Sequence, residues 1–223
     1  MTGGAYRQFL KDLPGLDSVK VALELGSRDA KDAVWLADHF GCEVITWEAN
    51  PPSIEVCEFV IGNREDITLV PFAAWSENTT IPFYPVINGN VGASSAFKAD
   101  PTYPHERRYQ QKQIEVNALR VEDWWSNRPA PELLCMDLQG AELEALKGCG
   151  ELLDNVEVIV TEGQYRPLYH DTPLLADLQA FLEEHDFHMV TGKRVNDWFG
   201  DFLFVKGRAW AIALESHFHP SPY

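Results

Sequence analysis

The sequence predicts an α/β fold in which a mostly parallel β-sheet carries helices on both faces. Apolar strand-like runs alternate with amphipathic helix-like segments along most of the chain, which is typical of parallel sheets. Two strand-like segments in residues 188–207 follow each other without a helix between them, which predicts an antiparallel edge. The length of 223 residues suits a single domain over residues 1–223, with residues 1–17 as an N-terminal helical extension.

The first half of the chain alternates between the two kinds of segment. The predicted strands are apolar runs that cover residues 18–26, 42–49, 67–75 and 80–86. The predicted helices between them cover residues 28–41 and 52–63. Gly41 closes the first helix and proline opens the second. Prolines in 80–86 indicate an edge strand, because proline cannot donate a ladder hydrogen bond.

The second half opens with residues 87–112, which are rich in Gly, Ser, Asn and Pro. A long irregular loop in a compact domain usually has a function, so we expect it on the substrate side. The strands predicted after it cover residues 113–119, 132–138 and 156–163. The helices predicted after it cover residues 121–128, a segment from Ala141, and residues 172–187. In the last helix, Thr172 is the expected cap and Pro173 the first helical residue.

Composition excludes several classes of function. The chain has 34 acidic residues against 18 Lys and Arg, a formal net charge of −16, so nucleic acid and anionic membranes are poor partners. No apolar run approaches the roughly 20 residues that span a bilayer, and the N-terminus has no signal-peptide core. We therefore expect a cytoplasmic protein. The chain has four cysteines, Cys42, Cys57, Cys135 and Cys149. They show no CxxC spacing, which predicts reduced and mostly buried thiols.

Acidic residues recur where the predicted parallel strands end. They are Glu24, Glu48, Asp137 and Glu162. The carboxyl ends of parallel strands share one edge of a sheet, where ligands bind. Glu48 stands 22 positions after Gly26, the spacing at which an acid accepts hydrogen bonds from ribose hydroxyls. Together these positions predict a nucleoside ligand.

The turn after the first strand distinguishes between nucleoside cofactors. Dinucleotide sites use GxGxxG, but here Gly26 is followed by Ser27, Arg28, Asp29 and Ala30. Acidic residues near this turn would also repel a diphosphate. The pattern therefore disfavours NAD and favours S-adenosylmethionine, which has a ribose, an adenine, an amine and a sulfonium but no phosphate.

The sequence resembles the FkbM family of S-adenosylmethionine-dependent methyltransferases. The similar stretches are VALELGSRDAKDA, VITWEANP, LVPFAAWSENTTIPFY, GASSAF, MDLQGAELEALKGCGELL and VEVIVTEGQY, in the family's order over most of residues 19–190. The resemblance implies the Rossmann-like class I methyltransferase fold, a seven-stranded sheet with an antiparallel last strand. It also implies O-methylation of a hydroxyl on a sugar or natural product, with S-adenosylhomocysteine as the coproduct.

The resemblance also places a cofactor site. It implies that Glu48 binds the ribose, that Asn50 and Ala74 lie near the adenine, and that Asp137 lies near the methionine part. The full predicted set is Glu24, Gly26, Ser27, Arg28, Asp29, Glu48, Ala49, Asn50, Ala74 and Asp137. Two departures matter. The turn that begins at Gly26 contains no second glycine. Position 139 is Gln where many members have an acid, so a divalent metal is possible there but not predicted.

The acceptor side is predicted from the same edge. Candidates for proton acceptance are Glu162, His170 and Asp137. Candidates for acceptor contact are Ser94, Ser95, His105 and Gln139. Each has a structural alternative: Asp137 as a helix cap, Glu162 paired with Arg166, the histidines solvated, the serines in a plain turn.

The predicted reaction is in-line methyl transfer to a small-molecule or glycan acceptor. Two other classes stay open: an NAD-dependent oxidoreductase on a similar fold, and a non-catalytic cofactor-binding or interaction protein. The oligomeric state is not predicted.

Overall fold

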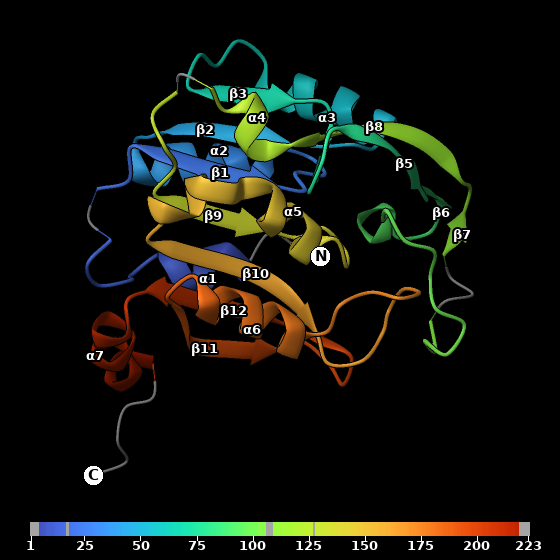
Figure 1. The fold of residues 1–223 in the computed structure, drawn as a ribbon. Helices are drawn as coiled ribbons and strands as arrows, with labels where there is room; N and C mark the ends of the chain where they lie inside the picture. Colours follow the sequence, from blue (N-terminus) through green and yellow to red (C-terminus); the bar gives the residue numbers. More distant parts are fainter. Residues whose placement is uncertain (1–4, 17, 106–108, 127, 219–223) are drawn as a thin grey trace.

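A seven-stranded sheet forms the centre of the molecule (Figure 1). The structure is a computed structural model that describes residues 5–16, 18–105, 109–126 and 128–218. The strand order is β11-β12-β10-β9-β1-β2-β3. The bounds are β1 (Val21–Leu25), β2 (Glu43–Trp47), β3 (Ile67–Val70), β9 (Leu133–Met136), β10 (Val158–Gln164), β11 (Phe187–Arg194) and β12 (Phe199–Lys206).

Strand direction confirms the predicted sheet. The pairs β1–β2, β2–β3, β1–β9 and β9–β10 are parallel, whereas β12 is antiparallel to both of its neighbours. The antiparallel strand is therefore the last one in the chain, as predicted. The predicted antiparallel edge is also confirmed: β11 and β12 pair antiparallel at one edge of the sheet, with β11 outermost.

Helices cover both faces of this sheet. Buried side chains of α1 (Ala5–Leu10), α2 (Lys31–Phe40), α3 (Pro51–Ile61) and α7 (Arg208–Phe218) share one apolar cluster with Ala22 of β1. Those of α5 (Glu142–Cys149) and α6 (Leu175–Glu184), with Val121 of α4 (Val121–Trp124), share another cluster with Leu23. Successive residues of a strand point to opposite faces, so both faces of the sheet are buried. Helix α7 was not among the predicted elements.

A second sheet packs beside the first (Figure 1). Its order is β4-β8-β5, with β4 (Ala73–Trp75), β5 (Thr79–Phe83) and β8 (Ile114–Arg120). The single strand predicted over 67–75 was therefore wrong. It breaks at Pro71, which has no N–H for a ladder, and the chain then changes sheets. Strand β5 is an edge strand, as its proline predicted, but of this second sheet.

The second sheet rests directly on α5. A Cβ atom on Gly148 would lie 1.8 Å from the carbonyl oxygen of Trp75, so only glycine permits this approach. The same α5 follows the loop that begins at Asp137, and a 3₁₀ turn (Gly150–Asp154) continues it. The helix therefore links the second sheet to the end of β9.

The predicted irregular loop 87–112 contains short elements of its own. They are β6 (Val86–Asn88), a 3₁₀ turn (Val91–Ala93) and β7 (Gln110–Gln111), and β6 pairs with β7. Backbone hydrogen bonds join this segment to the loop after β10: the N–H of His170 donates to Lys98, and the N–H of Asp100 donates to Leu168, both at 2.9 Å. The two loops thus form one connected layer above the strand ends.

Helix α6 begins later than predicted. Its first residue is Leu175, and the Asp177 carboxylate accepts the N–H of Leu174 at 2.9 Å. The hydroxyl of Thr172 donates instead to the carbonyl oxygen of Tyr169 at 3.0 Å, so Thr172 shapes the preceding loop rather than capping the helix. Helix α2 likewise begins at Lys31 rather than at residue 28. Within the described residues, no helix has both the length and the apolar character to cross a bilayer.

Candidate active site

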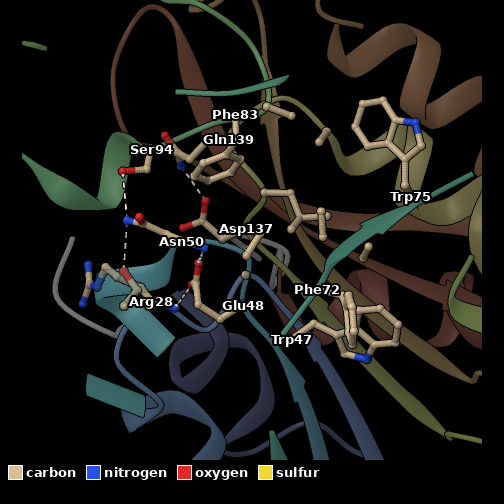
Figure 2. A pocket seen from close by; sticks show the side chains of 18 of the residues that line it. Arg28, Trp47, Glu48, Asn50, Phe72, Trp75, Phe83, Ser94, Asp137 and Gln139 are labelled. Atoms are coloured by element: carbon tan, nitrogen blue, oxygen red, sulfur yellow. Dashed lines mark hydrogen bonds between the residues drawn. The ribbon is translucent and has the colours of Figure 1, made fainter. Parts of the chain in front are cut away.

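A pocket opens at the carboxyl ends of β1, β2 and β9, between the two sheets (Figure 2). Its walls come from the turns after these strands, from the start of the second sheet and from the 91–96 segment. The lining residues are Gly26, Arg28, Trp47, Glu48, Ala49, Asn50, Ser53, Phe72, Ala73, Ala74, Trp75, Ile81, Phe83, Val91, Gly92, Ser94, Ala96, Asp137, Leu138, Gln139 and Ala141. Aromatic and polar side chains both face it, a mixture typical of small-molecule sites.

The turn after β1 forms the floor of the pocket. Gly26 has φ +92°, and a Cβ there would lie 2.1 Å from the carbonyl oxygen of Asp137. The chain therefore passes against the end of β9 with no space for a side chain. Arg28 and Ala30 take left-handed conformations, with φ of 57° and 54°. These two residues supply the bend that further glycines provide in a dinucleotide-binding turn.

Glu48 is a fixed hydrogen-bond acceptor on the pocket wall. One carboxylate oxygen accepts the N–H of Arg28 at 2.6 Å, and the other accepts the N–H of Asn50 at 2.7 Å. Burial raises the pKa of Glu48, and these backbone donors oppose that rise. Each carboxylate oxygen has a second lone pair, so the group can still accept a pair of ligand hydroxyls.

Asn50 presents an unmatched acceptor beside Glu48. Its amide nitrogen donates to Ser53 at 3.2 Å and lies 3.5 Å from the Ser94 hydroxyl. Its side-chain oxygen is buried and has no hydrogen-bond partner in the described structure. An unpaired buried acceptor costs free energy, and a donor on a bound ligand would remove that cost.

Asp137 and Gln139 form a polar network at the end of β9. The Gln139 amide nitrogen donates to Asp137 at 2.5 Å and to Glu162 at 3.2 Å, and the Tyr169 hydroxyl donates to the Gln139 amide oxygen at 2.7 Å. Burial raises the pKa of Asp137, and the bond from Gln139 opposes the rise. Burial, with the nearby charges of Asp137 and Glu142, raises the pKa of Glu162 well above its ordinary range.

The structure brings nine of the predicted site residues to the pocket wall. They are Gly26, Arg28, Glu48, Ala49, Asn50, Ala74, Ser94, Asp137 and Gln139. Asp137 does not cap the next helix. Glu142, the first residue of α5, holds the loop before the helix: its carboxylate accepts the N–H groups of Leu138 at 2.8 Å and Gly140 at 3.0 Å.

Three residues predicted to bind the cofactor do not line the pocket. Glu24 is buried within β1, where it accepts the Thr46 hydroxyl at 2.5 Å. Ser27 is buried and its hydroxyl has no partner in the described structure. Asp29 pairs with Lys31 at 2.8 Å.

Four residues predicted on the acceptor side also do not line the cofactor pocket. Glu162 lies inside β10 and is shielded from the pocket by Gln139. The His170 side chain is 48% exposed and 3.8 Å from Asp100, away from the pocket lining. The Ser95 hydroxyl is buried and donates to the Gln139 carbonyl at 2.7 Å. His105 lies at a second groove, described below.

Sequence reasoning missed most of the apolar wall. Phe72, Trp75, Ile81 and Phe83 come from the second sheet and from its junction with the first. The available signal was Pro71, which interrupts the apolar run 67–75 and marks where the chain leaves the main sheet. The pairing of β4 with β8 is a long-range contact, and periodicity alone does not predict it.

We expect a pH-dependent contribution to stability from Glu24. Burial is the main cause that raises its pKa to about 8; the hydrogen bond from Thr46 opposes the rise, and the charges of Asp32 and Glu48 add to it. The native state therefore keeps a proton that the unfolded chain releases, and the free energy of unfolding falls as pH rises from about 4.5 to about 8. The neutral variant Glu24→Gln should lose less stability than wild type over this range.

Thermal unfolding of both proteins between about pH 5 and about pH 8 measures the effect. Wild type should lose melting temperature relative to Glu24→Gln as pH rises, with the curves closest at the acidic end. Glu58→Gln, at an exposed position of α3, is the control and should follow wild type. Parallel curves for wild type and Glu24→Gln would contradict the assignment.

Solved structures with a similar overall fold include a methyltransferase and a protein with bound S-adenosyl-L-methionine. The precorrin-6y C5,15-methyltransferase of Geobacter metallireducens GS-15 superposes with a TM-score of 0.50 at 13% identity, over 86% of this chain and 83% of that one. Fibrillarin of Aeropyrum pernix, solved with natively bound S-adenosyl-L-methionine, gives a TM-score of 0.53 at 11% identity, over 90% and 72%. The fold is thus that of the Rossmann-like S-adenosylmethionine-dependent methyltransferases.

The family follows from the sequence. Residues 29–189 match the methyltransferase FkbM domain, and the chain belongs to this family of methyltransferases. It is also similar to the 2-O-methyltransferase NoeI of Sinorhizobium fredii (strain NBRC 101917 / NGR234), at 28% identity over 184 residues, which is 78% of this chain and 74% of that protein. The predicted family and enzyme class are confirmed, which disfavours the oxidoreductase and non-catalytic alternatives.

The pocket fits the cofactor of this family and fold, S-adenosylmethionine. Glu48 has lone pairs for two hydroxyls, and Asn50 has an unmatched buried acceptor. The Phe72 ring and Ala74 give the same pocket an apolar wall suited to a flat base. Within the described ranges, no group of three or more His, Cys, Asp or Glu could hold a metal ion.

Proposed function

We propose that this methyltransferase acts on oxygen, transferring the methyl group of S-adenosylmethionine to a hydroxyl of a sugar, natural product or other small metabolite. The observation that carries the proposal is the placement of Glu48, Asn50 and Asp137 on one pocket at the carboxyl ends of the strands (Figure 2). The similarity to a protein named as a 2-O-methyltransferase supports a hydroxyl acceptor.

The cofactor, when bound, supplies a methyl group activated by a sulfonium. The chain's own residues then have to hold the reactants in line. Glu48, fixed by the N–H groups of Arg28 and Asn50, accepts the ribose hydroxyls. Asn50 accepts a donor through its free oxygen, and Phe72 and Ala74 contact the base.

Asp137 is the residue we assign to the acceptor proton. Among the described residues, two carboxylates line the pocket, Glu48 and Asp137. Burial raises the pKa of Asp137. A raised pKa brings a carboxylate closer to the pH at which it takes a hydroxyl proton. Gln139 holds the side chain through its amide, and Glu162 and Tyr169 hold Gln139 in turn.

The net charge of −16 and the lack of a basic lining, apart from Arg28, favour a small neutral acceptor over nucleic acid or an anionic membrane. A metal is not needed in this proposal, because proton transfer is assigned to a carboxylate.

Calorimetric titration with S-adenosylhomocysteine, with NAD as the control ligand, tests the cofactor site. We expect binding of S-adenosylhomocysteine alone. A screen of hydroxyl-bearing acceptors with S-adenosylmethionine should then release S-adenosylhomocysteine and give a product whose new methyl group is on oxygen by NMR. Failure to bind S-adenosylhomocysteine, or a product methylated on carbon or nitrogen, would contradict the proposal.

A further inference from the structure

A second groove lies next to the cofactor pocket, lined by residues from the 89–105 segment, the loop after β10 and the turn between β11 and β12. Its residues are Gly89, Asn90, Tyr103, His105, Tyr109, Gln139, Leu168, Asn196 and Phe199. Gln139 lines both cavities, so the two meet at this side chain. Gln139 also donates to Asp137 at 2.5 Å, so the groove and Asp137 are separated by this one side chain.

Aromatic rings line the groove. Tyr103 is the central ring, with Tyr109 at 5.9 Å, His105 at 5.5 Å and Trp198 at 5.1 Å between ring centroids. Tyr103 is buried, Tyr109 is half-buried and His105 is exposed, so the rings form a graded surface from floor to rim. Such a surface offers flat faces for the C–H groups of a ring-shaped ligand.

Amide side chains complete the groove. The side-chain oxygens of Asn90 and Asn196 accept backbone N–H groups of their own turns, from Gly92 at 3.1 Å and from Trp198 at 2.8 Å. These bonds hold both side chains and leave their NH2 groups able to donate to a ligand. Neutral donors of this kind match hydroxyl oxygens.

The groove lining is also nearly without charge. In the described part of the chain, no Lys, Arg, Asp or Glu lines it, and His105 is its one titratable side chain besides the tyrosines. A phosphate or carboxylate ligand would find no paired cation there. A purely apolar ligand would leave the NH2 groups of Asn90 and Asn196 without a ligand acceptor. The lining therefore suits a ring with many hydroxyls and no charge.

The fold connects this groove rigidly to the reacting end. Tyr103, Leu168 and Tyr169 belong to one buried cluster, and Tyr169 donates its hydroxyl to the Gln139 amide oxygen at 2.7 Å. The same hydroxyl lies 3.2 Å from the Ala93 carbonyl oxygen, in the segment that lines the cofactor pocket. Tyr169 thus joins the aromatic cluster at the groove to Gln139 and to the segment that lines the cofactor pocket.

We propose that this groove binds the acceptor as a neutral pyranose, seated on Tyr103 and Tyr109 with a hydroxyl directed past Gln139 to Asp137. The inference rests on the proposed function and adds to it the place and the chemical class of the acceptor. The rim residue His105, predicted from sequence as an acceptor contact, belongs to this site.

Saturation-transfer NMR on the full chain with saturating S-adenosylhomocysteine tests the proposal. The probes are methyl glycosides of neutral hexoses, 6-deoxyhexoses and N-acetylhexosamines, with glucose 6-phosphate as the charged comparison. We expect saturation transfer to ring protons of at least one neutral glycoside. Tyr109→Ala and His105→Ala should each reduce that signal by about fivefold or more. Phe59→Ala, at an 86% exposed aromatic on α3, is the matched control and should leave it unchanged.

The outcomes separate this inference from the proposed function. If the wild-type protein does not bind S-adenosylhomocysteine, the proposed function itself is contradicted. Normal S-adenosylhomocysteine binding with no signal from any neutral glycoside would overturn the groove alone. So would a stronger signal from glucose 6-phosphate than from methyl glucoside, or a glycoside signal that both groove variants retain. His105→Ala changes an exposed side chain, so it remains informative if Tyr109→Ala fails to fold.

Discussion

Replacing Gly26 with alanine should unfold part of the active site and abolish S-adenosylhomocysteine binding. The new Cβ would lie 2.1 Å from the carbonyl oxygen of Asp137, and the residue has φ +92°, which L side chains rarely adopt. Both backbones would have to move apart, at a cost of about 3 kcal/mol or more. For a chain of this size, that loss lowers the melting temperature by about 6–12 °C.

Gly41→Ala is the matched control for this experiment. Gly41 also has positive φ, +63°, but no heavy atom lies within 4 Å of the Cβ position. It should therefore cost only about 1 kcal/mol, from backbone conformation alone. Thermal unfolding and calorimetric titration of both variants distinguish the effect of the steric clash at position 26 from the effect of a positive φ alone. If Gly26→Ala melted and bound S-adenosylhomocysteine like Gly41→Ala, the close approach of β1 and β9 would not matter.

Glu48→Ala should weaken S-adenosylhomocysteine binding by about 100-fold, with the fold retained. Hydrogen bonds to a charged group contribute about 1.5–3 kcal/mol each, and the proposed ribose contact uses two. The variant also releases the N–H groups of Arg28 and Asn50, which Glu48 holds at 2.6 and 2.7 Å. Calorimetric titration measures the change in the dissociation constant directly.

Glu55→Ala is the appropriate comparison for Glu48→Ala, because Glu55 is exposed on α3 in the same part of the chain. Its affinity for S-adenosylhomocysteine should equal that of wild type. An affinity of Glu48→Ala within about threefold of wild type would show that Glu48 holds only the loop and that the ribose binds elsewhere.

The main sheet could be predicted from the sequence because its signals are local. Each parallel strand is a short apolar run, and a helix of clear period follows most of them. The second sheet was not predicted as a separate layer. Its strands β4 and β8 pair across a long stretch of chain, Ala73 with Ala118, and nothing in either segment specifies the partner. Pro71 marks the change of sheet but does not say where the chain goes next.

Prediction of the site succeeded where a residue lies just past the end of its strand. Gly26, Glu48 and Asp137 each follow within one residue of β1, β2 and β9, and all three line the pocket. Glu24 and Glu162 lie inside β1 and β10 and point into the protein. Strand β10 runs two residues beyond Glu162 because it also pairs with β12, Gln164 opposite Phe199, and that contact is not local.

The backbone hydrogen bonds between residues 98–100 and the loop after β10 limit which loops can be exchanged in protein engineering. His170 donates to Lys98, Asp100 donates to Leu168, and Ala99 bridges to Tyr169, so the two loops are joined along three successive residues. A graft of either loop from a relative would break this seam and displace Gln139 through Tyr169. Exchange of both loops together, between β5 and β8 and between β10 and α6, would keep the seam intact. The pair is therefore the smallest unit in which acceptor preference can be transplanted.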